Sequence, residues 1–139
     1  MEQGGDRERA LVTGASSGIG MEIARILASQ NCDLLICARR KKELEDLSKE
    51  LTKKYNINCE VVVADLTTDK GINNLIKKTK SIDILINNAG FGILGNHNEM
   101  PLDRQLEMIN LNIHALTRLS HEFGNQMIVK GKGKIMNVA

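Results

Sequence analysis

Glycines and small polar residues at positions 13–20 form the segment of the chain best suited to bind a ligand. The segment reads Thr-Gly-Ala-Ser-Ser-Gly-Ile-Gly, follows an apolar run and leads into a helix-period pattern. Glycines let a backbone turn sharply and approach a pyrophosphate, and free N–H groups at a helix start attract its negative charge. The Gly-x-x-x-Gly-x-Gly spacing differs from G-x-G-x-x-G, and no lysine follows the last glycine as in a P-loop. We expect a phosphate-binding turn here, the alternative being a tight turn without a ligand.

Two arginines bear on which nucleotide would bind. Arg39 and Arg40 follow the second apolar run, and Arg39 lies 19 positions after Gly20. In dinucleotide-binding folds an acid near this place binds the ribose 2′-hydroxyl of NAD, whereas an arginine accommodates the 2′-phosphate of NADP. The nearest acid, Glu43, already lies one turn into the next predicted helix. The sequence therefore favours NADP over NAD, the alternative being two solvated arginines.

Five short apolar runs alternate with helix-period segments and would position these residues. The runs cover residues 10–13, 34–37, 61–64, 82–86 and 135–138. Most are uninterrupted, as in strands that helices cover on both faces of a parallel sheet. Apolar stripes at spacings of three and four residues predict the helices, of which the longest begins near Pro101. Right-handed crossovers then predict a doubly wound α/β sheet in a single domain, residues 1–139.

Composition and charge argue against several classes of protein. The chain has 19 Lys and Arg against 17 Asp and Glu, with no like-charge block forming a tail, so we expect neither nucleic acid nor membrane as a partner. No apolar run approaches the roughly 20 residues that span a bilayer. A polar N-terminus and three cysteines without C-x-x-C spacing predict a cytoplasmic protein. His114 and His121 have no carboxylate or thiol in metal-ligand spacing, so we expect no metal site.

Four motifs, in order along the chain, resemble those of the short-chain dehydrogenase/reductase family. They are the glycine segment at 13–20, Asp65-Leu66, Asn87-Asn88-Ala89-Gly90 and Leu111-Asn112-Ile113. The resemblance implies a Rossmann-type sheet, for which we expect five strands in the order 3-2-1-4-5 with helices on both faces. It also implies hydride transfer between NAD(P) and an alcohol or carbonyl substrate, and a homo-oligomer for the full-length protein.

Carried over position by position, the resemblance assigns roles to single residues. Asp65 would accept from the adenine amino group, with Leu66 beside it; its alternative role is to cap the third helix. Asn87 would act through its backbone on the nicotinamide side. Asn112 is the catalytic candidate, because its counterpart in the family holds a water in the proton relay; the alternative is a polar residue that kinks the helix. The candidate cofactor-binding residues are Gly14, Ser16, Ser17, Gly18, Ile19, Gly20, Arg39, Arg40, Asp65, Leu66, Asn87, Ala89 and Gly90.

The general acid of that family, a Tyr-x-x-x-Lys pair, has no counterpart in these 139 residues. Tyr55 is the sole tyrosine, Cys59 stands four positions after it, and the family's serine would follow Ala139. We therefore expect the cofactor-binding part of such an oxidoreductase, truncated after its fifth strand and inactive by itself. Two alternatives stay open: a non-catalytic dinucleotide-binding or regulatory module, and an S-adenosylmethionine methyltransferase, which would carry an acid in place of Arg39.

Overall fold

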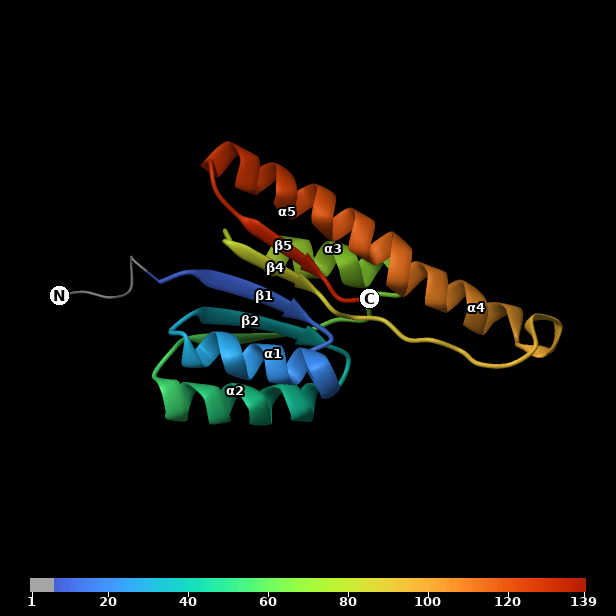
Figure 1. Ribbon diagram of the computed structural model, residues 1–139, viewed down its shortest axis with the longest axis horizontal. Helices are drawn as coiled ribbons and strands as arrows, with labels where there is room; N and C mark the ends of the chain where they lie inside the picture. Colours follow the sequence, from blue (N-terminus) through green and yellow to red (C-terminus); the bar gives the residue numbers. More distant parts are fainter. Residues whose placement is uncertain (1–6) are drawn as a thin grey trace.

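Parallel strands form the centre of the molecule, and helices lie against both faces of the sheet (Figure 1). The computed structural model describes residues 7–139. The strands are β1 (Arg9–Thr13), β2 (Asp33–Ala38), β3 (Cys59–Val63), β4 (Ile84–Asn87) and β5 (Lys134–Asn137). The helices are α1 (Gly18–Ser29), α2 (Lys41–Tyr55), α3 (Asp69–Lys78), α4 (Leu102–Ile109) and α5 (Leu116–Lys130), with a short 3-10 turn η2 (His97–Glu99) and a π-helical segment η3 (Asn110–Ala115). The strand order β3-β2-β1-β4-β5 and the parallel pairing confirm the predicted fold class.

Local sequence signals account for where several helices begin and end. The Thr68 side chain accepts a hydrogen bond from the Gly71 N–H at 3.0 Å and so caps the start of α3. Helix α2 ends at Asn56, which has a left-handed φ of 55°. Helix α5 ends at Gly131, with a φ of 85°, as the glycine after the last apolar position predicts.

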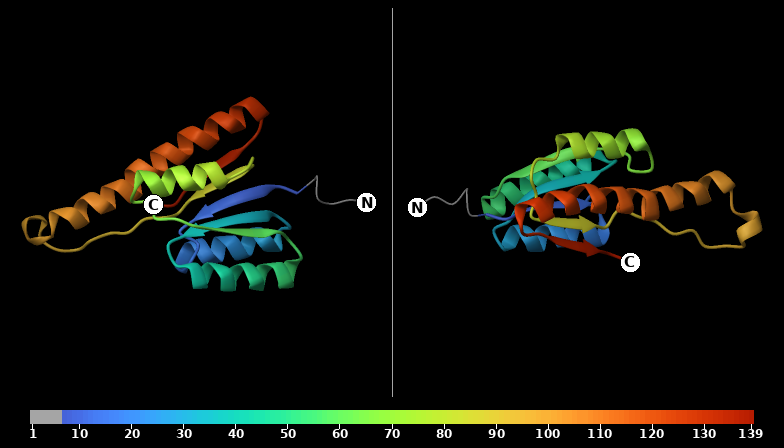
Figure 2. Two further views of the ribbon diagram at one scale, coloured as in Figure 1. Left: turned by 180° about the vertical axis from the view of Figure 1, so that it is seen from behind. Right: turned by 90° about the horizontal axis from the view of Figure 1, so that it is seen from above.

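Alternating side chains of the strands divide between two aliphatic cores. Ala10 and Val12 of β1 pack with α1 and α2, whereas Leu11 between them packs with α3 and α5. Helix α2 contributes Leu44, Leu47 and Leu51 to the first core, while α3 and α5 contribute Ile72, Leu75, Leu119 and Phe123 to the second. Burying a side chain of this size stabilises the fold by roughly 1.5–3 kcal/mol. The two helical layers hold the strands between them, and because the strands are parallel their carboxyl ends lie together (Figure 2).

The connection from β4 to β5 is helical without a break from Leu102 to Lys130, as predicted, but its apolar stripe is buried only in part. The stripe is buried in α5, through Leu119, Phe123 and Met127, whereas α4 contains no buried residue. Leu102 and Leu106 of α4 are 66% and 47% exposed. The reason is that α4 extends past the carboxyl edge of the sheet, as Figure 2 shows; the π-helical turn η3 joins it to α5.

Within residues 7–139, no helix combines the length and the apolar character needed to cross a bilayer.

Candidate functional site

The glycine turn between β1 and α1 needs glycine for two different reasons. Gly14 and Gly18 have φ values of 64° and 57°, in the left-handed region that residues with a side chain rarely adopt. A Cβ atom on Gly20 would overlap the carbonyl oxygen of Gly14, so this position requires close backbone approach. Ser17 precedes α1 without a capping bond from its side chain. The first N–H groups of α1 are therefore available to an anion.

Thr13 and Asn88 join the glycine turn to the end of β4. The buried Thr13 hydroxyl accepts hydrogen bonds from the backbone N–H groups of Asn88 and Ala89, both at 3.0 Å. The Asn88 amide in turn donates to the carbonyl oxygens of Thr13 and Gly14, at 3.2 and 3.1 Å. Sequence reasoning did not assign a role to either side chain, although both belong to motifs that it singled out. These bonds hold the glycine turn after β1 next to the Asn-Asn-Ala-Gly segment after β4.

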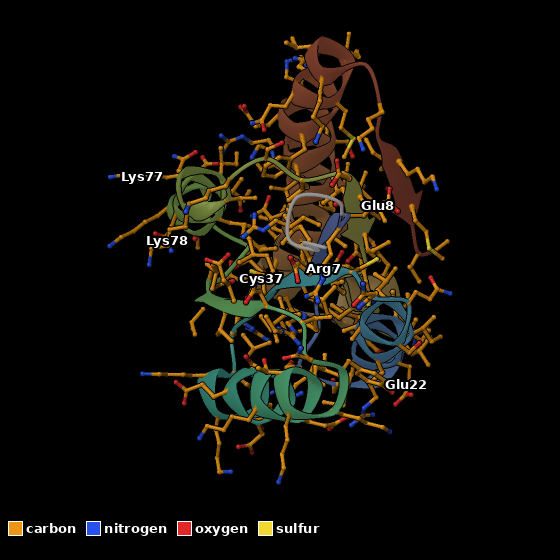
Figure 3. The ribbon with its side chains drawn as sticks, turned by 90° about the vertical axis from the view of Figure 1, so that its left-hand side faces the viewer. Arg7, Glu8, Glu22, Cys37, Lys77 and Lys78 are labelled. Carbon is orange, nitrogen blue, oxygen red and sulfur yellow. The ribbon has the colours of Figure 1, made fainter. Side chains whose placement is uncertain are left out.

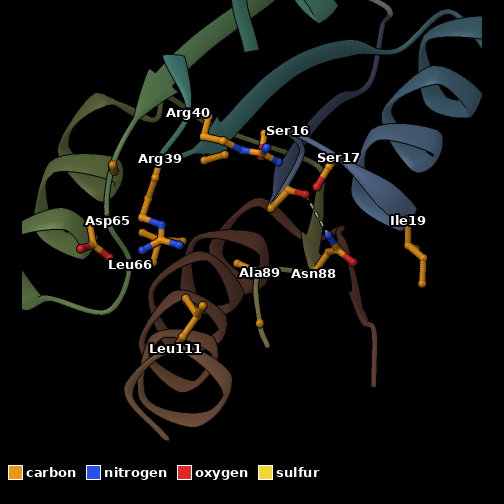
Figure 4. Close-up of a pocket in the computed structure, with 14 residues that line it drawn as sticks. Ser16, Ser17, Ile19, Arg39, Arg40, Asp65, Leu66, Asn88, Ala89 and Leu111 are labelled. Carbon is orange, nitrogen blue, oxygen red and sulfur yellow. Dashed lines mark hydrogen bonds between the residues drawn. The ribbon is translucent and has the colours of Figure 1, made fainter. Parts of the chain in front are cut away.

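A cavity of about 670 Å³ opens at the carboxyl ends of the strands. Figure 4 shows the side chains around it, which come from the loops after β1, β2, β3 and β4 and from η3. Its lining is Gly14, Ser16, Ser17, Ile19, Ala38, Arg39, Arg40, Ala64, Asp65, Leu66, Asn88, Ala89, Gly90 and Leu111. Of the predicted site residues, Gly18, Gly20, Asn87 and Asn112 are not part of this lining. The loops after four strands thus converge on one cavity, because their strands are parallel.

The arginines at the end of β2 border the cavity at different points. Arg40 donates to the hydroxyl of Ser16 at 3.3 Å, and its guanidinium lies 3.6 Å from the Glu43 carboxylate. The Arg40 side chain is 55% exposed, so this ion pair contributes little to stability. Arg39 extends toward Asp65, as Figure 4 shows. Two guanidinium groups therefore stand at the cavity with hydrogen-bonding capacity left for a ligand.

Asp65 is held as a carboxylate on the opposite side of the cavity from the glycine turn. Burial raises the pKa of Asp65, but hydrogen bonds from the Thr67 hydroxyl and N–H, at 2.7 and 3.0 Å, and the charge of Arg39 lower this pKa below its usual value. The alternative role as a cap of α3 is wrong, because the side chain of Thr68 makes that bond. Asp65 instead accepts through its backbone oxygen from the Thr68 hydroxyl at 3.0 Å. Its side chain stiffens the loop between β3 and α3.

Asn87 connects β4 to the neighbouring elements and does not line the cavity. Its side-chain amide donates to the Ser120 hydroxyl of α5 at 2.9 Å and to the Asn137 side-chain oxygen of β5 at 3.0 Å. Its carbonyl oxygen accepts from the Val138 N–H at 3.0 Å. The residue is only 4% exposed. Its polar groups are thus engaged with α5, β5 and the segment that follows β5.

Asn112 binds the loop that leaves β4. Its side-chain amide donates to the Phe91 carbonyl oxygen at 2.8 Å, and its side-chain oxygen accepts from the Phe91 N–H at 3.0 Å. A Cβ atom on Gly90 would lie 2.7 Å from that same oxygen, so the contact requires glycine. Asn112 belongs to the π-helical segment η3, a type of irregularity often found at functional sites. The residue next to it, Leu111, lines the cavity.

The remaining chemistry-bearing side chains lie away from the cavity. Tyr55 is the last residue of α2. The loop that follows it lies against the start of β2, because the N–H of Asn58 donates to the Asp33 carboxylate at 2.9 Å. His114 is exposed and pairs with Asp69 of α3 at 2.9 Å. Within the part of the chain that the structure describes, no group of three His, Cys, Asp or Glu side chains is arranged to hold a metal ion.

Comparison with known proteins gives consistent matches along the chain. The family described as short chain dehydrogenase matches residues 8–139. An NADP-dependent 3-hydroxy acid dehydrogenase of Schizosaccharomyces pombe is 35% identical over 96% of this chain and 54% of that protein. A human protein named inactive hydroxysteroid dehydrogenase-like protein 1 is 28% identical over 94% of this chain and 41% of its own length.

Solved structures agree with this match. A short-chain dehydrogenase from Sphingobium yanoikuyae in complex with NADPH is 34% identical, with a TM-score of 0.89 over 94% of this chain and 52% of that one. The chain thus spans about half the length of the proteins that it matches.

Proposed function

Because the chain belongs to the short-chain dehydrogenase family, we propose that its cavity binds NADP(H) and that it is the cofactor-binding part of an oxidoreductase. The reaction would be hydride transfer between NADP(H) and an alcohol or carbonyl substrate. The observation that carries the proposal is the convergence of a glycine turn, two arginines and a carboxylate on one cavity. A volume of about 670 Å³ falls within the range of small-molecule sites, about 300–1,000 Å³.

The residues of the cavity fit a dinucleotide phosphate by their chemistry. The glycine turn and the start of α1, with Ser16, Ser17 and Ile19, would hold the pyrophosphate against backbone N–H groups. Arg39 and Arg40 would bind the 2′-phosphate, for which guanidinium groups have matching donors. The Asp65 carboxylate, with Leu66 beside it, would accept from the adenine amino group. Ala89 and Gly90 would bound the nicotinamide side, where the bound cofactor supplies the hydride, and Asn87, which is buried behind them, would act there only by fixing the end of β4.

Catalysis would need a proton donor, and the family's donor, a Tyr-x-x-x-Lys pair, has no counterpart in these 139 residues. Reduction of a carbonyl leaves an alkoxide, and a general acid within hydrogen-bond reach must protonate it. Tyr55 lies at the amino edge of the sheet, opposite the cavity, and has no lysine four residues later. Asn112, which also binds the Phe91 backbone, would hold a water of the proton relay, as its counterpart in the family does. We place the protein in the cytoplasm because its three cysteines are free, and we expect the full-length enzyme to be a homo-oligomer.

A second function, that of a non-catalytic dinucleotide-binding or regulatory module, has one observation in its favour. A relative over 94% of this chain carries the word inactive in its name. The methyltransferase alternative is less favourable, since Arg39 stands where that class would carry an acid. Both an oxidoreductase and a regulatory module would bind the cofactor, and only the first would turn it over when a Ser, a Tyr and a Lys are present.

Titration of the purified chain with NADPH and with NADH, followed by cofactor fluorescence, tests the proposal. We expect saturable binding of both and a lower Kd for NADPH. A folded chain that binds neither cofactor would contradict the assignment of the cavity. Equal Kd values would retain dinucleotide binding and remove the preference for NADP.

A further inference from the structure

The edge of the sheet opposite the cavity collects most of the lysines of the chain. Every strand begins at this edge, and the helices α2, α3 and α5 end there because each runs back against the parallel strands. We call the lysines that lie there the lysine edge: Lys53, Lys54, Lys77, Lys78, Lys80, Lys130, Lys132 and Lys134. They are eight of the twelve lysines in the sequence. Figure 3 looks onto this edge and shows Lys77 and Lys78 projecting outward from α3.

The acidic groups described at this edge are largely paired inside the fold. The Asp83 carboxylate accepts from Lys130 at 2.8 Å and from the Arg9 N–H at 2.9 Å, and its side chain is only 14% exposed. Asp33 is equally covered and pairs with Arg7 at 3.2 Å. Two further acids lie on this side of the described chain: Glu8, labelled in Figure 3, and Glu60 of β3, which pairs with Arg9. The outward-facing charge of the edge is therefore strongly positive.

Two exposed apolar side chains accompany the lysines. Ile128 and Val129, in the last turn of α5, are 77% and 89% exposed. Lys130 follows them and donates to the Ser81 hydroxyl at 3.0 Å, so this turn lies beside the loop after α3 that carries Lys80. An apolar tip thus stands among lysines that come from two helices and a strand.

Helix electrostatics explain only part of this arrangement. Lysines in the last turn of a helix are stabilised by the partial negative charge of its carbonyl groups. That accounts for Lys53, Lys54, Lys77, Lys78 and Lys130. It does not account for Lys80, Lys132 and Lys134, which lie outside the helices, nor for an exposed Ile-Val pair.

We propose that the lysine edge, with Ile128 and Val129 at its apolar tip, docks the protein on an anionic lipid surface. Lysines near such a surface strengthen binding by roughly fivefold each, and exposed aliphatic side chains enter the boundary between headgroups and acyl chains. Lipid fits this edge better than nucleic acid because the apolar pair would have no role on a phosphate backbone. Docking this edge would leave the cavity, at the opposite edge, open to water. The proposal differs from our sequence-based expectation of no membrane partner, and it is independent of cofactor binding.

Vesicle sedimentation with matched charge-reversal variants tests the proposal. The purified chain is mixed with vesicles of phosphatidylcholine alone or with about a quarter phosphatidylserine, a content chosen to give a clearly negative surface. We expect binding to the second kind only, and its loss at high salt. Lys77→Glu/Lys78→Glu/Lys80→Glu, at exposed lysines of the edge, should weaken the partition coefficient by at least about tenfold. Lys41→Glu/Lys49→Glu/Lys70→Glu changes the net charge equally at exposed lysines elsewhere and should weaken it much less.

A second pair of variants separates lipid from a general polyanion. Ile128→Ser/Val129→Ser should lower the affinity for phosphatidylserine vesicles, whereas Leu94→Ser, at a side chain that is 99% exposed near the cavity edge, should not. Circular dichroism of each variant checks that it is folded. Equal losses in the two charge variants would overturn the proposal. So would unchanged lipid binding by the apolar variant, or binding to duplex RNA that is tighter than to the vesicles.

Discussion

Two arginines at the end of β2 account, in our proposal, for the choice of cofactor. Arg39 and Arg40 border the cavity, and Arg40 is joined to Ser16 of the glycine turn at 3.3 Å. Replacing both by alanine removes the donors for a 2′-phosphate and leaves the glycine turn in place. We predict that Arg39→Ala/Arg40→Ala weakens NADPH binding by roughly 10- to 100-fold with little change for NADH, as measured by fluorescence titration. Lys41→Ala is the matched control, and a parallel loss for both cofactors would refute the assignment.

The Asp83 carboxylate, at the edge of the sheet opposite the cavity, makes the folding stability depend on pH. Burial raises the pKa of Asp83, but the bonds from Lys130 and the Arg9 N–H outweigh it and lower this pKa below the usual value. The charged form therefore stabilises the fold at neutral pH, and that stability is lost as the pH falls from about 4 through the pKa in the folded state. We predict that Asp83→Asn lowers the free energy of unfolding at pH 7 by about 1–3 kcal/mol.

Urea unfolding at several pH values measures this effect. As the pH falls below 4 and through the lowered pKa of Asp83 in the folded state, the difference between Asp83→Asn and the unchanged chain should shrink, because both finally carry a neutral group. Glu45→Gln, at an exposed position in the middle of α2, serves as the control and should be near neutral at every pH. A difference that stayed constant down to the acid limit would show that the charge of Asp83 is not the cause.

Among the elements, the π-helical segment η3 is joined to the loop after β4 by one side chain. Asn112 makes two bonds to the Phe91 backbone, and Arg104 of α4 lies over the Phe91 ring at 4.2 Å. Asn112→Ala removes both backbone bonds at a residue that is exposed, so the fold itself should persist. We predict that hydrogen exchange at the Phe91 amide accelerates by about tenfold, while Asn110→Ala, in the same segment, leaves it unchanged. Equal exchange rates of the Phe91 amide in the two variants would show that the Asn112 bonds do not stabilise this loop.

For the molecule as a whole, we predict that these 139 residues bind the cofactor but show no turnover. Hydride transfer places charge on the substrate oxygen, and the described chain brings no tyrosine or lysine acid to the cavity. NADPH oxidation would be followed by absorbance with a panel of ketones and aldehydes. The comparison is a form extended by a segment that carries the family's Ser, Tyr and Lys. Similar rates for both forms would require another proton donor within this sequence.

Several features of the protein could be predicted from the sequence alone because they depend on neighbouring residues. Continuous apolar runs and helix-period stripes predicted five parallel strands, and the family resemblance implied their order; the structure confirms both. The glycine turn was equally visible, since positive φ values and close approach at Gly14, Gly18 and Gly20 are local requirements. Arg39 and Arg40 could be placed at the cavity from the sequence, because they directly follow the apolar run that forms β2 and the cavity lies at the carboxyl ends of the strands.

Other features were decided only when distant residues packed together. The side chain of Asn87 lies 50 positions from its partner in β5, and that of Asn112 lies 21 positions from Phe91, so no local pattern reveals either bond. The stripe through α4 is apolar, yet none of its residues is buried. Helix α4 projects past the sheet, and whether a helix is covered depends on where the neighbouring elements end. The lysines are scattered through a chain of nearly balanced charge, and only the parallel arrangement of strands and returning helices brings them to one edge.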